Sequence, residues 1–311
     1  MWMLSPLLLL FAALDGDDYK KPFDYDASAP LNTTQKLLWE REGVQVSDVT
    51  YDSPRGGKVT AFVVSPSKAR TRNAGIVFGH WGPGNRTEFL PEAQAMARLG
   101  VVCVLVDYPW KRPEPWYADA DDVMEPDKAV RLHQQAVIDL RRALDLLVAR
   151  DDVDPQRLAY VGHSYGAQFG GILSAVEKRL KGVVLMGGVP DMEAILLNGK
   201  GPALKSYLEK NKDHIEGSLK KLRATAAVEF VPHSTPTPLL FQFARHEWDF
   251  DVAAMERYYK AAGDPKSVRW YETGHELNDV RAMADRSRWL AGRLRLRGVD
   301  AMLKNLVARH Q

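Results

Sequence analysis

Short apolar runs alternate with longer segments of helical spacing along most of this chain, and this alternation limits its fold more than any other feature. Eight runs have strand character: 44–51, 58–65, 74–79, 101–108, 158–162, 182–188, 238–244 and 267–273. The first two alternate polar with apolar residues, as half-exposed antiparallel strands do. The later runs are almost continuously apolar, which is typical of strands covered on both faces.

Between these runs lie five segments with apolar residues at three- and four-residue steps: 88–99, 127–149, 167–180, 251–262 and 278–296. Strand and helix in alternation predict an α/β fold, with a mainly parallel, doubly wound, eight-stranded sheet and helices on both of its faces. In such sheets, reactive groups gather on the loops at the carboxyl ends of the strands. Those loops are therefore where a functional site is expected.

The organisation of the chain favours one large domain over residues 17–311, because no linker divides its 311 residues, of which 45% are hydrophobic. The segment 191–236 is predicted to be a helical, cap-like insertion. Residues 1–16 contain the apolar block Leu7 to Leu14, which is too short to cross a bilayer but suits a signal peptide. We therefore expect export to the periplasm or medium. A packed N-terminal segment of a cytoplasmic protein is the alternative, since no Lys or Arg precedes the block.

Charge and cysteine content exclude several classes of partner. The chain has 42 basic and 40 acidic side chains, well mixed, with a net charge of +2, which disfavours nucleic-acid binding. Its only cysteine, Cys103, lies in an apolar run and is expected to be a buried small hydrophobe. No stable membrane span is expected, and the sequence leaves the oligomeric state open.

The motif Gly162-His163-Ser164-Tyr165-Gly166 falls between a predicted strand and a predicted helix. In that context G-x-S-x-G indicates a sharp turn that raises a nucleophilic serine above the sheet, with glycines where side chains would not fit. Ser164 is the candidate nucleophile. The amide of Tyr165, at the start of the following helix, is a candidate donor to an oxyanion.

A serine nucleophile requires a histidine base oriented by an acid. His275 follows the last predicted strand and is the candidate base, whereas structural roles are expected for His80 and His163. The loop after the preceding strand offers Glu247 and Asp249, and spacing alone does not decide between them. No complete metal-ligand pattern is present, so neither a metal nor another cofactor is expected.

A second oxyanion donor is expected on the glycine-rich loop 79–84, which follows the run 74–79. Pro83 has no amide hydrogen, so Trp81 and Gly82 are the two candidates. Aromatic side chains on the loop after the run 101–108 could hold an apolar part of a substrate, or could pack on the edge of the sheet. These candidate substrate contacts are Trp110, Trp116 and Tyr117.

The order of these motifs, oxyanion loop, serine turn, acid and then histidine, resembles the α/β-hydrolase superfamily over residues 40–296. Within it, the stretches GHWGPGNRTEFLPEA and WYETGHELND are similar to dienelactone-hydrolase-like proteins and related bacterial esterases. Dienelactone hydrolases use a cysteine nucleophile where this chain has Ser164, so their lactone specificity is not implied. The resemblance places the acid at Glu247, with Asp249 as the alternative.

We therefore predict a cofactor-independent serine hydrolase that cleaves a small carboxylic ester through an acyl-enzyme. A peptidase, thioesterase or acyltransferase of the same fold is the alternative, because a triad determines acyl transfer but not the leaving group. A non-catalytic binding module is a third hypothesis, and it would be expected to lack a triad member.

Overall fold

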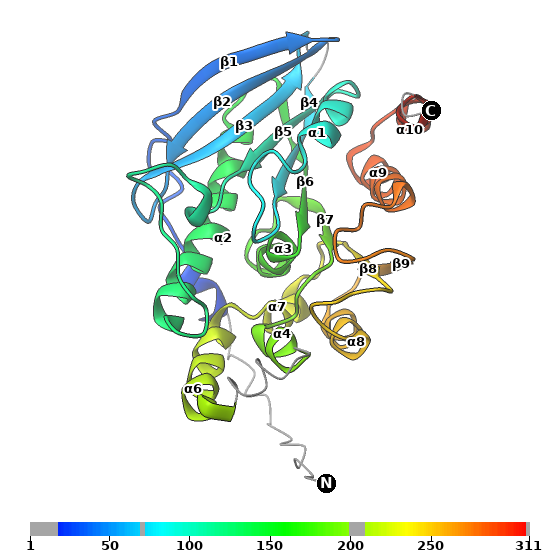
Figure 1. Ribbon diagram of the computed structural model, residues 1–311. Helices are drawn as coiled ribbons and strands as arrows, with labels where there is room; N and C mark the ends of the chain where they lie inside the picture. Colours follow the sequence, from blue (N-terminus) through cyan, green and yellow to red (C-terminus); the bar gives the residue numbers. More distant parts are fainter. Residues whose placement is uncertain (1–17, 69–71, 199–208, 309–311) are drawn as a thin grey trace.

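A nine-stranded sheet runs through the molecule, with helices on both faces (Figure 1). The computed structural model describes residues 18–68, 72–198 and 209–308. The strand order is β1-β2-β3-β5-β4-β6-β7-β8-β9. The strands are β1 (Thr34–Arg41), β2 (Val44–Asp52), β3 (Lys58–Pro66), β4 (Asn73–Gly79), β5 (Val101–Val106), β6 (Val153–His163), β7 (Leu180–Met186), β8 (Leu239–Ala244) and β9 (Lys266–Tyr271).

The pairing agrees with the predicted strand types. β1, β2 and β3 pair in antiparallel fashion and β3 joins β5 in the same way, whereas every pair from β5 to β9 is parallel. The predicted count of eight strands is wrong, because β1 adds a ninth at the edge. Seven of its eight side chains are exposed, so β1 has none of the apolar alternation that marks a half-buried strand.

Helices cover the two faces as follows. On one face lie α1 (Leu90–Ala97) and α9 (Val280–Leu294), and on the other lie α2 (Pro126–Val148), α3 (Tyr165–Val176) and α8 (Val252–Ala261). These five match the predicted helices. The chain also contains α4 (Met192–Asn198), α6 (Lys212–Leu222), α7 (Ala227–Phe230) and α10 (Val299–Ala308), with the short 3-10 helices η1 (Asp18–Phe23), η2 (Pro109–Lys111), η3 (Arg223–Thr225) and η4 (Val231–His233).

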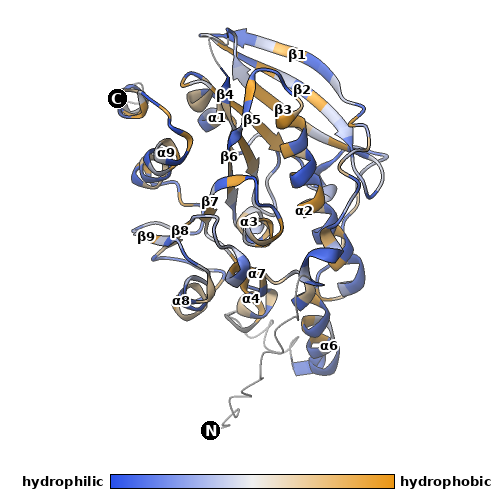
Figure 2. Cartoon of the chain, turned by 180° about the vertical axis from the view of Figure 1, so that it is seen from behind, coloured by the Kyte–Doolittle hydropathy of each residue, from blue (hydrophilic) through white to orange (hydrophobic). Residues whose placement is uncertain are grey.

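The core has two halves, one on each face of the sheet. Successive residues of β4 contribute to opposite halves, since Val77 packs toward α2 and α3 while Ile76 and Phe78 pack toward α1 and α9. Figure 2 shows the central strands mostly in orange, whereas β1 is mainly blue. The hydrophobic central strands are therefore enclosed between two helical layers, as the apolar runs predicted.

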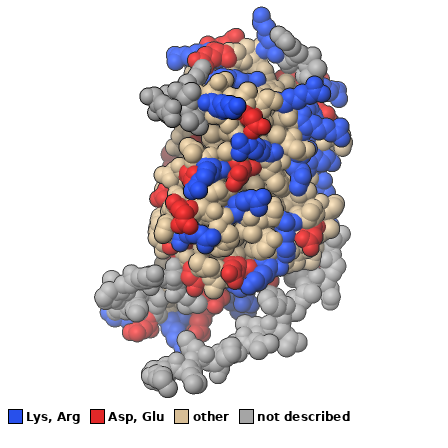
Figure 3. Space-filling view, turned by 90° about the vertical axis from the view of Figure 1, so that its right-hand side faces the viewer, with Lys and Arg blue, Asp and Glu red and all other residues tan. Residues whose placement is uncertain are grey.

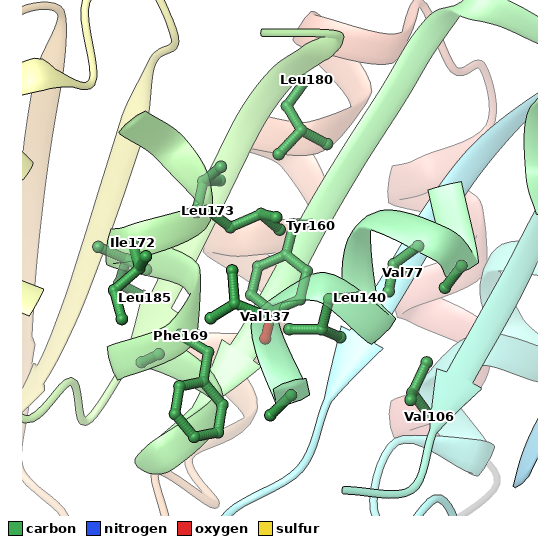
Figure 4. Close-up of a cluster of buried hydrophobic side chains, with 14 of the residues drawn as sticks. Val77, Val106, Val137, Leu140, Tyr160, Phe169, Ile172, Leu173, Leu180 and Leu185 are labelled. Atoms are coloured by element: carbon green, nitrogen blue, oxygen red, sulfur yellow. The ribbon is translucent and has the colours of Figure 1, made fainter. Parts of the chain in front are cut away.

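Tyr160 supports the end of β6 from inside the core. Its ring lies among Val137, Leu140 and Leu173 (Figure 4), and its hydroxyl donates a hydrogen bond of 2.7 Å to the carbonyl of Gly166. A buried hydroxyl of this kind fixes the turn between β6 and α3 from below.

The carboxyl ends of the parallel strands lie at one edge of the sheet. Gly79 of β4 is in register with Gly162 of β6, and His163 is in register with Met186 of β7. The loops that follow β4, β6, β8 and β9 therefore meet at this edge.

Several predictions concern other parts of the molecule. Residues 1–16 lie outside the described residues, and so does part of the predicted insertion 191–236. Between β7 and β8 the structure describes α4, α6 and α7.

Among the described residues, no helix is both long and apolar enough to cross a membrane. On the face shown in Figure 3, acidic side chains are scattered among Lys and Arg side chains.

Candidate active site

The turn between β6 and α3 holds Ser164 in an uncommon backbone conformation, with φ 54° and ψ −112°. Its amide donates to the carbonyl of Met186 at 2.8 Å. A Cβ at Gly162 would collide with the carbonyl of Gly166, and a Cβ at Gly166 would collide with the carbonyl of Gly79. The glycines are therefore required by close backbone approach on both sides of the serine.

The amide of Tyr165 points out of the amino-terminal end of α3. The carbonyl of Ser164 accepts from the amide of Gln168 at 2.9 Å, so it points along the helix, and the N–H of the same trans peptide points the opposite way. No acceptor for this amide occurs among the described residues. The geometry leaves it available to a negatively charged oxygen.

The peptide between Trp81 and Gly82 is held in one orientation. The Trp81 carbonyl accepts from Nδ1 of His80 at 2.5 Å and from the amide of Gly84 at 3.1 Å. The Gly82 N–H therefore points to the opposite side, and within the described part of the chain it has no acceptor. The Trp81 amide, in contrast, donates to Oε2 of Glu88 at 2.8 Å. Of the two candidate donors, only Gly82 has a free amide.

His80 can fix this peptide because its protonation state is determined. Its Nε2 accepts from the amide of Tyr108 at 3.2 Å, so its proton lies on Nδ1 and is donated to the Trp81 carbonyl. Burial lowers the pKa of His80 to about 4, against the opposing effect of the hydrogen bond to Trp81. The ring is therefore neutral at pH 7.

His275 lies in the loop after β9, and its Nδ1 is 2.8 Å from Oε2 of Glu247 in the loop after β8. The other oxygen of Glu247 accepts from the amides of Trp248 and Asp249 at 2.9 and 3.0 Å. Asp249 lies on the other side of the ring, with Oδ2 3.8 Å from Nε2. Glu247 is thus the acid that contacts Nδ1, the nitrogen through which an acid orients a catalytic histidine.

The surroundings of His275 favour its charged form. Burial alone would lower the pKa of His275, but the hydrogen bond and charge of Glu247, together with the charges of Asp249 and Glu276, outweigh burial and raise it above 6.5. Its Nε2 is buried and has no hydrogen-bond partner among the described residues. The neutral imidazole of His275 can therefore accept a proton at Nε2, and the imidazolium that forms is stabilised by the neighbouring carboxylates.

Ser164 and His275 meet at the end of β7. The amide of Ser164 donates to the carbonyl of Met186, the last residue of β7. Gly187, which follows Met186, lies against His275, since a Cβ placed on Gly187 would be 3.2 Å from the carbonyl oxygen of His275 and 3.4 Å from its Cε1. No hydrogen bond joins the Ser164 hydroxyl to His275 within the described part of the chain. In enzymes without substrate, this bond is often long and tightens only in the complex.

Glu247, Asp249 and His275 are also the one group of His, Cys, Asp and Glu side chains, among the described residues, whose ligand atoms converge, within 4.8 Å of one another. Two of the three already share a hydrogen bond. The arrangement is that of an acid and a base, and it lacks the additional histidine or cysteine ligands of a typical zinc site.

A cavity of about 340 Å³ lies next to Gly82 and Tyr165, the two residues with free amides, whereas Ser164 and His275 are not among the residues that line it. Its lining includes Gly82, Trp110, Lys111, Asp122, His133 and Tyr165. Trp110 Nε1 donates to the Gly82 carbonyl at 3.1 Å, and the Tyr165 hydroxyl donates to Asp122 at 2.5 Å. Although burial would raise the pKa of Asp122, hydrogen bonds from His133 and Tyr165 and the charge of His133 lower it. The cavity therefore contains a carboxylate beside two aromatic rings.

Of the three aromatic side chains predicted to contact substrate, the structure places only Trp110 in this cavity. Trp116 packs on the turn at Gly57, where its ring lies 3.3 Å from the position of a Cβ. Tyr117 is exposed and donates to Asp119. The contact of Trp116 is therefore with the turn between β2 and β3.

Two groups that the sequence analysis did not assign to the site lie inside it. His163 Nδ1 is 2.6 Å from Oε1 of Glu88, and its Nε2 is 2.9 Å from the carbonyl oxygen of His275. His163 adjoins the nucleophile in sequence, which is the one signal that could have indicated it. Glu88 carries no such signal, because it reaches the site only through the fold of the loop 80–89 between β4 and α1.

Neither the family models nor the curated proteins contain a match to this chain. Solved structures do match. The acetyl xylan esterase from Paenibacillus sp. R4 is 18% identical, with a TM-score of 0.72 over 89% of this chain and 93% of that one. The acetyl xylan esterase 1 from Thermoanaerobacterium sp. JW/SL YS485 is 14% identical, with a TM-score of 0.73 over 93% and 92%. An alpha/beta hydrolase from Penicillium sp. sh18 is 16% identical, with a TM-score of 0.60 over 80% and 99%.

The chain has the α/β-hydrolase fold. The predicted fold class is thereby confirmed. At these identities the similarity concerns the fold, and the dienelactone-hydrolase-like branch stays a prediction. The reaction has to be inferred from the site itself.

Proposed function

We propose that this protein is a cofactor-independent serine hydrolase that cleaves a small carboxylic ester through an acyl-enzyme. The observation that carries the proposal is the hydrogen bond between His275 Nδ1 and Glu247, on the loops after β9 and β8. It leaves the opposite ring nitrogen, Nε2, buried and without a hydrogen-bond partner among the described residues. His275 and Ser164 both lie against the end of β7. Nucleophile, base and acid thus come from three strand ends, in the roles that acyl transfer requires.

In this mechanism the Ser164 hydroxyl oxygen attacks the ester carbonyl while Nε2 of His275 takes its proton. Glu247 stabilises the imidazolium, and the amides of Tyr165 and Gly82 donate to the oxyanion. As the intermediate collapses, His275 returns the proton to the leaving alcohol. Water, deprotonated by the same nitrogen, then attacks the acyl-enzyme and releases the acid and the free serine.

The substrate is proposed to be a small molecule whose polar part occupies the cavity lined by Gly82 and Tyr165. Support comes from the Asp122 carboxylate and the rings of Trp110 and Tyr165, which could hold a hydroxyl-bearing group by hydrogen bonds and stacking. Acetate esters are the first to test, since two of the similar structures are acetyl xylan esterases.

The same site could serve a peptidase, thioesterase or acyltransferase, because the triad leaves the leaving group open. A non-catalytic module is a weaker alternative, since candidates for all three triad positions are present. We also propose export directed by residues 1–16. Fractionation of cells that express the full chain tests this, and a chain found only in the cytosol would contradict it.

Initial rates on a panel of substrates test the function. The panel contains p-nitrophenyl acetate, butyrate and octanoate, an acetyl thioester and a peptide anilide, with Ser164→Ala as the matched control. We expect the acetate to be hydrolysed fastest and Ser164→Ala to lose at least about 10³-fold in kcat. Faster cleavage of the thioester or the anilide would favour the alternatives. Full activity of Ser164→Ala would exclude the mechanism.

A further inference from the structure

An unbroken line of hydrogen bonds connects the oxyanion turn to the loop of the candidate base. The Trp81 amide donates to Oε2 of Glu88, whose Oε1 lies 2.6 Å from Nδ1 of His163. Nε2 of His163 lies 2.9 Å from the carbonyl oxygen of His275. His163 is buried, its ring stacks with Trp81 at 6.0 Å between centroids, and it lies 5.2 Å from the ring of His275.

The hydrogen-bond partners of His163 determine how many protons His163 and Glu88 carry together. A carbonyl oxygen can only accept, so Nε2 of His163 must carry a proton to bind His275. A hydrogen bond of 2.6 Å at Nδ1 needs one more proton, on either Nδ1 or the carboxyl of Glu88. Without this second proton, the lone pair of Nδ1 would face the negatively charged carboxylate of Glu88. Glu88 and His163 together therefore carry no net charge, as an ion pair or as a neutral pair.

Two groups that the reaction depends on are held at the ends of this line. At one end, the Trp81 amide is fixed by Glu88, and the carbonyl of the same residue is fixed by His80 and Gly84, so the Gly82 N–H is aimed at the oxyanion. At the other end, the backbone of His275 is held, which sets the direction of its ring. A small change in the direction of the Gly82 N–H or of the His275 ring reduces stabilisation of the transition state far more than it reduces substrate affinity.

We propose that Glu88 and His163 form a positioning pair that aligns the Gly82 amide and the His275 ring with Ser164. The inference rests on the proposed function, because it names the residues that aim the groups of that site. It assigns to His163 a role beyond that of a turn residue. It also assigns a role to Glu88, which the sequence analysis placed only at the start of a predicted helix.

The test compares Glu88→Ala with Glu88→Gln on p-nitrophenyl acetate. A glutamine can accept from the Trp81 amide and donate to Nδ1 of a neutral His163, so every hydrogen bond of the line is retained. Alanine retains none of them at this position. We expect kcat to fall roughly 10- to 100-fold in Glu88→Ala, with KM within about threefold of wild type, and kcat to stay within about threefold in Glu88→Gln.

Glu92→Gln is the matched control. Glu92 lies four residues further on, in the first turn of α1, and its carboxylate binds Arg286 of α9 in a buried ion pair away from the site. This variant should lower the melting temperature and leave kcat unchanged. His163→Gln and His163→Asn provide a second comparison. The glutamine amide reaches toward the His275 carbonyl, whereas the shorter asparagine reaches only Glu88, so kcat should fall further in His163→Asn.

The outcomes separate the two proposals. If the wild-type protein hydrolyses none of the esters, thioesters or anilides, the proposed function fails, and this inference fails with it. If wild type is active and folded Glu88→Ala keeps its kcat, the positioning role alone is overturned. Equal losses in Glu88→Ala and Glu88→Gln, or equal kcat in the two His163 variants, would also overturn it.

Discussion

Nδ1 of His275 lies 2.8 Å from Oε2 of Glu247, and both side chains are almost completely buried. The second carboxylate of the loop, Asp249, is on the opposite side of the ring and more exposed. This relationship separates two acids that are only two residues apart in sequence. Glu247 can hold the tautomer in which Nε2 is free, and Asp249 can influence the charge of the ring without orienting it.

The first prediction concerns these two acids. Glu247→Gln should lower kcat on p-nitrophenyl acetate on the order of 10²- to 10⁴-fold, because an amide no longer stabilises the imidazolium. Asp249→Asn, the matched control in the same loop, should lower kcat less than about tenfold. Steady-state kinetics with both purified variants checks this. A larger loss in Asp249→Asn would assign the acid to Asp249.

The second prediction concerns pH. His275 must be neutral to accept the proton of Ser164, and its pKa is raised above 6.5, so kcat/KM should fall as pH drops, with half of the maximum reached above pH 6.5. Because the negative charge of Asp249 contributes to raising this pKa, Asp249→Asn should move the half-maximum to lower pH. A wild-type half-maximum below pH 6.5, or a shift to higher pH in the variant, would contradict this assignment.

The third prediction concerns the glycines of the serine turn. Gly166→Ala places a Cβ against the carbonyl of Gly79, so it should lower the free energy of unfolding by roughly 1–3 kcal/mol and abolish most activity. Gly292→Ala, inside α9, meets no atom within 4 Å and should be stabilising by about 0.5–1 kcal/mol. Urea denaturation of both variants distinguishes them. Equal stabilities would mean that the turn tolerates a side chain.

The fourth prediction concerns the loop that carries Trp110. Arg112 of this loop forms a completely buried ion pair of 2.5 Å with Asp139 of α2. Asp139→Ala leaves the guanidinium buried without its partner and should lower the free energy of unfolding by about 3–5 kcal/mol. The exposed pair of Lys260 and Glu256 is the control, since Glu256→Ala should change stability by about 0.5 kcal/mol or less. Similar effects of the two changes would be inconsistent with this packing.

The sequence predicted the interior of the fold well because burial leaves a pattern in the chain. Eight strands and five helices lie where apolar spacing placed them. β1 was missed since an exposed edge strand needs no such pattern, and α10 lies beyond the last predicted helix. Ser164 and His275 were predictable because their positions at strand ends follow from the same alternation.

The finer parts of the site could not be derived from apolar spacing, because they depend on how loops turn. Spacing left Glu247 and Asp249 open, and only the family resemblance favoured Glu247. In the structure, backbone amides hold the Glu247 carboxylate, which contacts Nδ1 of His275. The Trp81 amide is engaged by Glu88, seven residues away, which no local pattern reveals. Likewise, Trp110 lines the cavity and Trp116 does not because of the course of the loop that carries both, which the sequence does not indicate.

The most direct test of the central claim is covalent labelling of the wild-type protein with diethyl p-nitrophenyl phosphate, read out by intact mass and peptide mapping. Attack by an activated serine on phosphorus releases p-nitrophenol and leaves a stable phosphoryl-enzyme. We predict one diethylphosphoryl group per chain, located on Ser164, and no labelling of Ser164→Ala or of unfolded protein. Labelling at another residue, or full esterase activity in protein that the reagent leaves unmodified, would contradict the account.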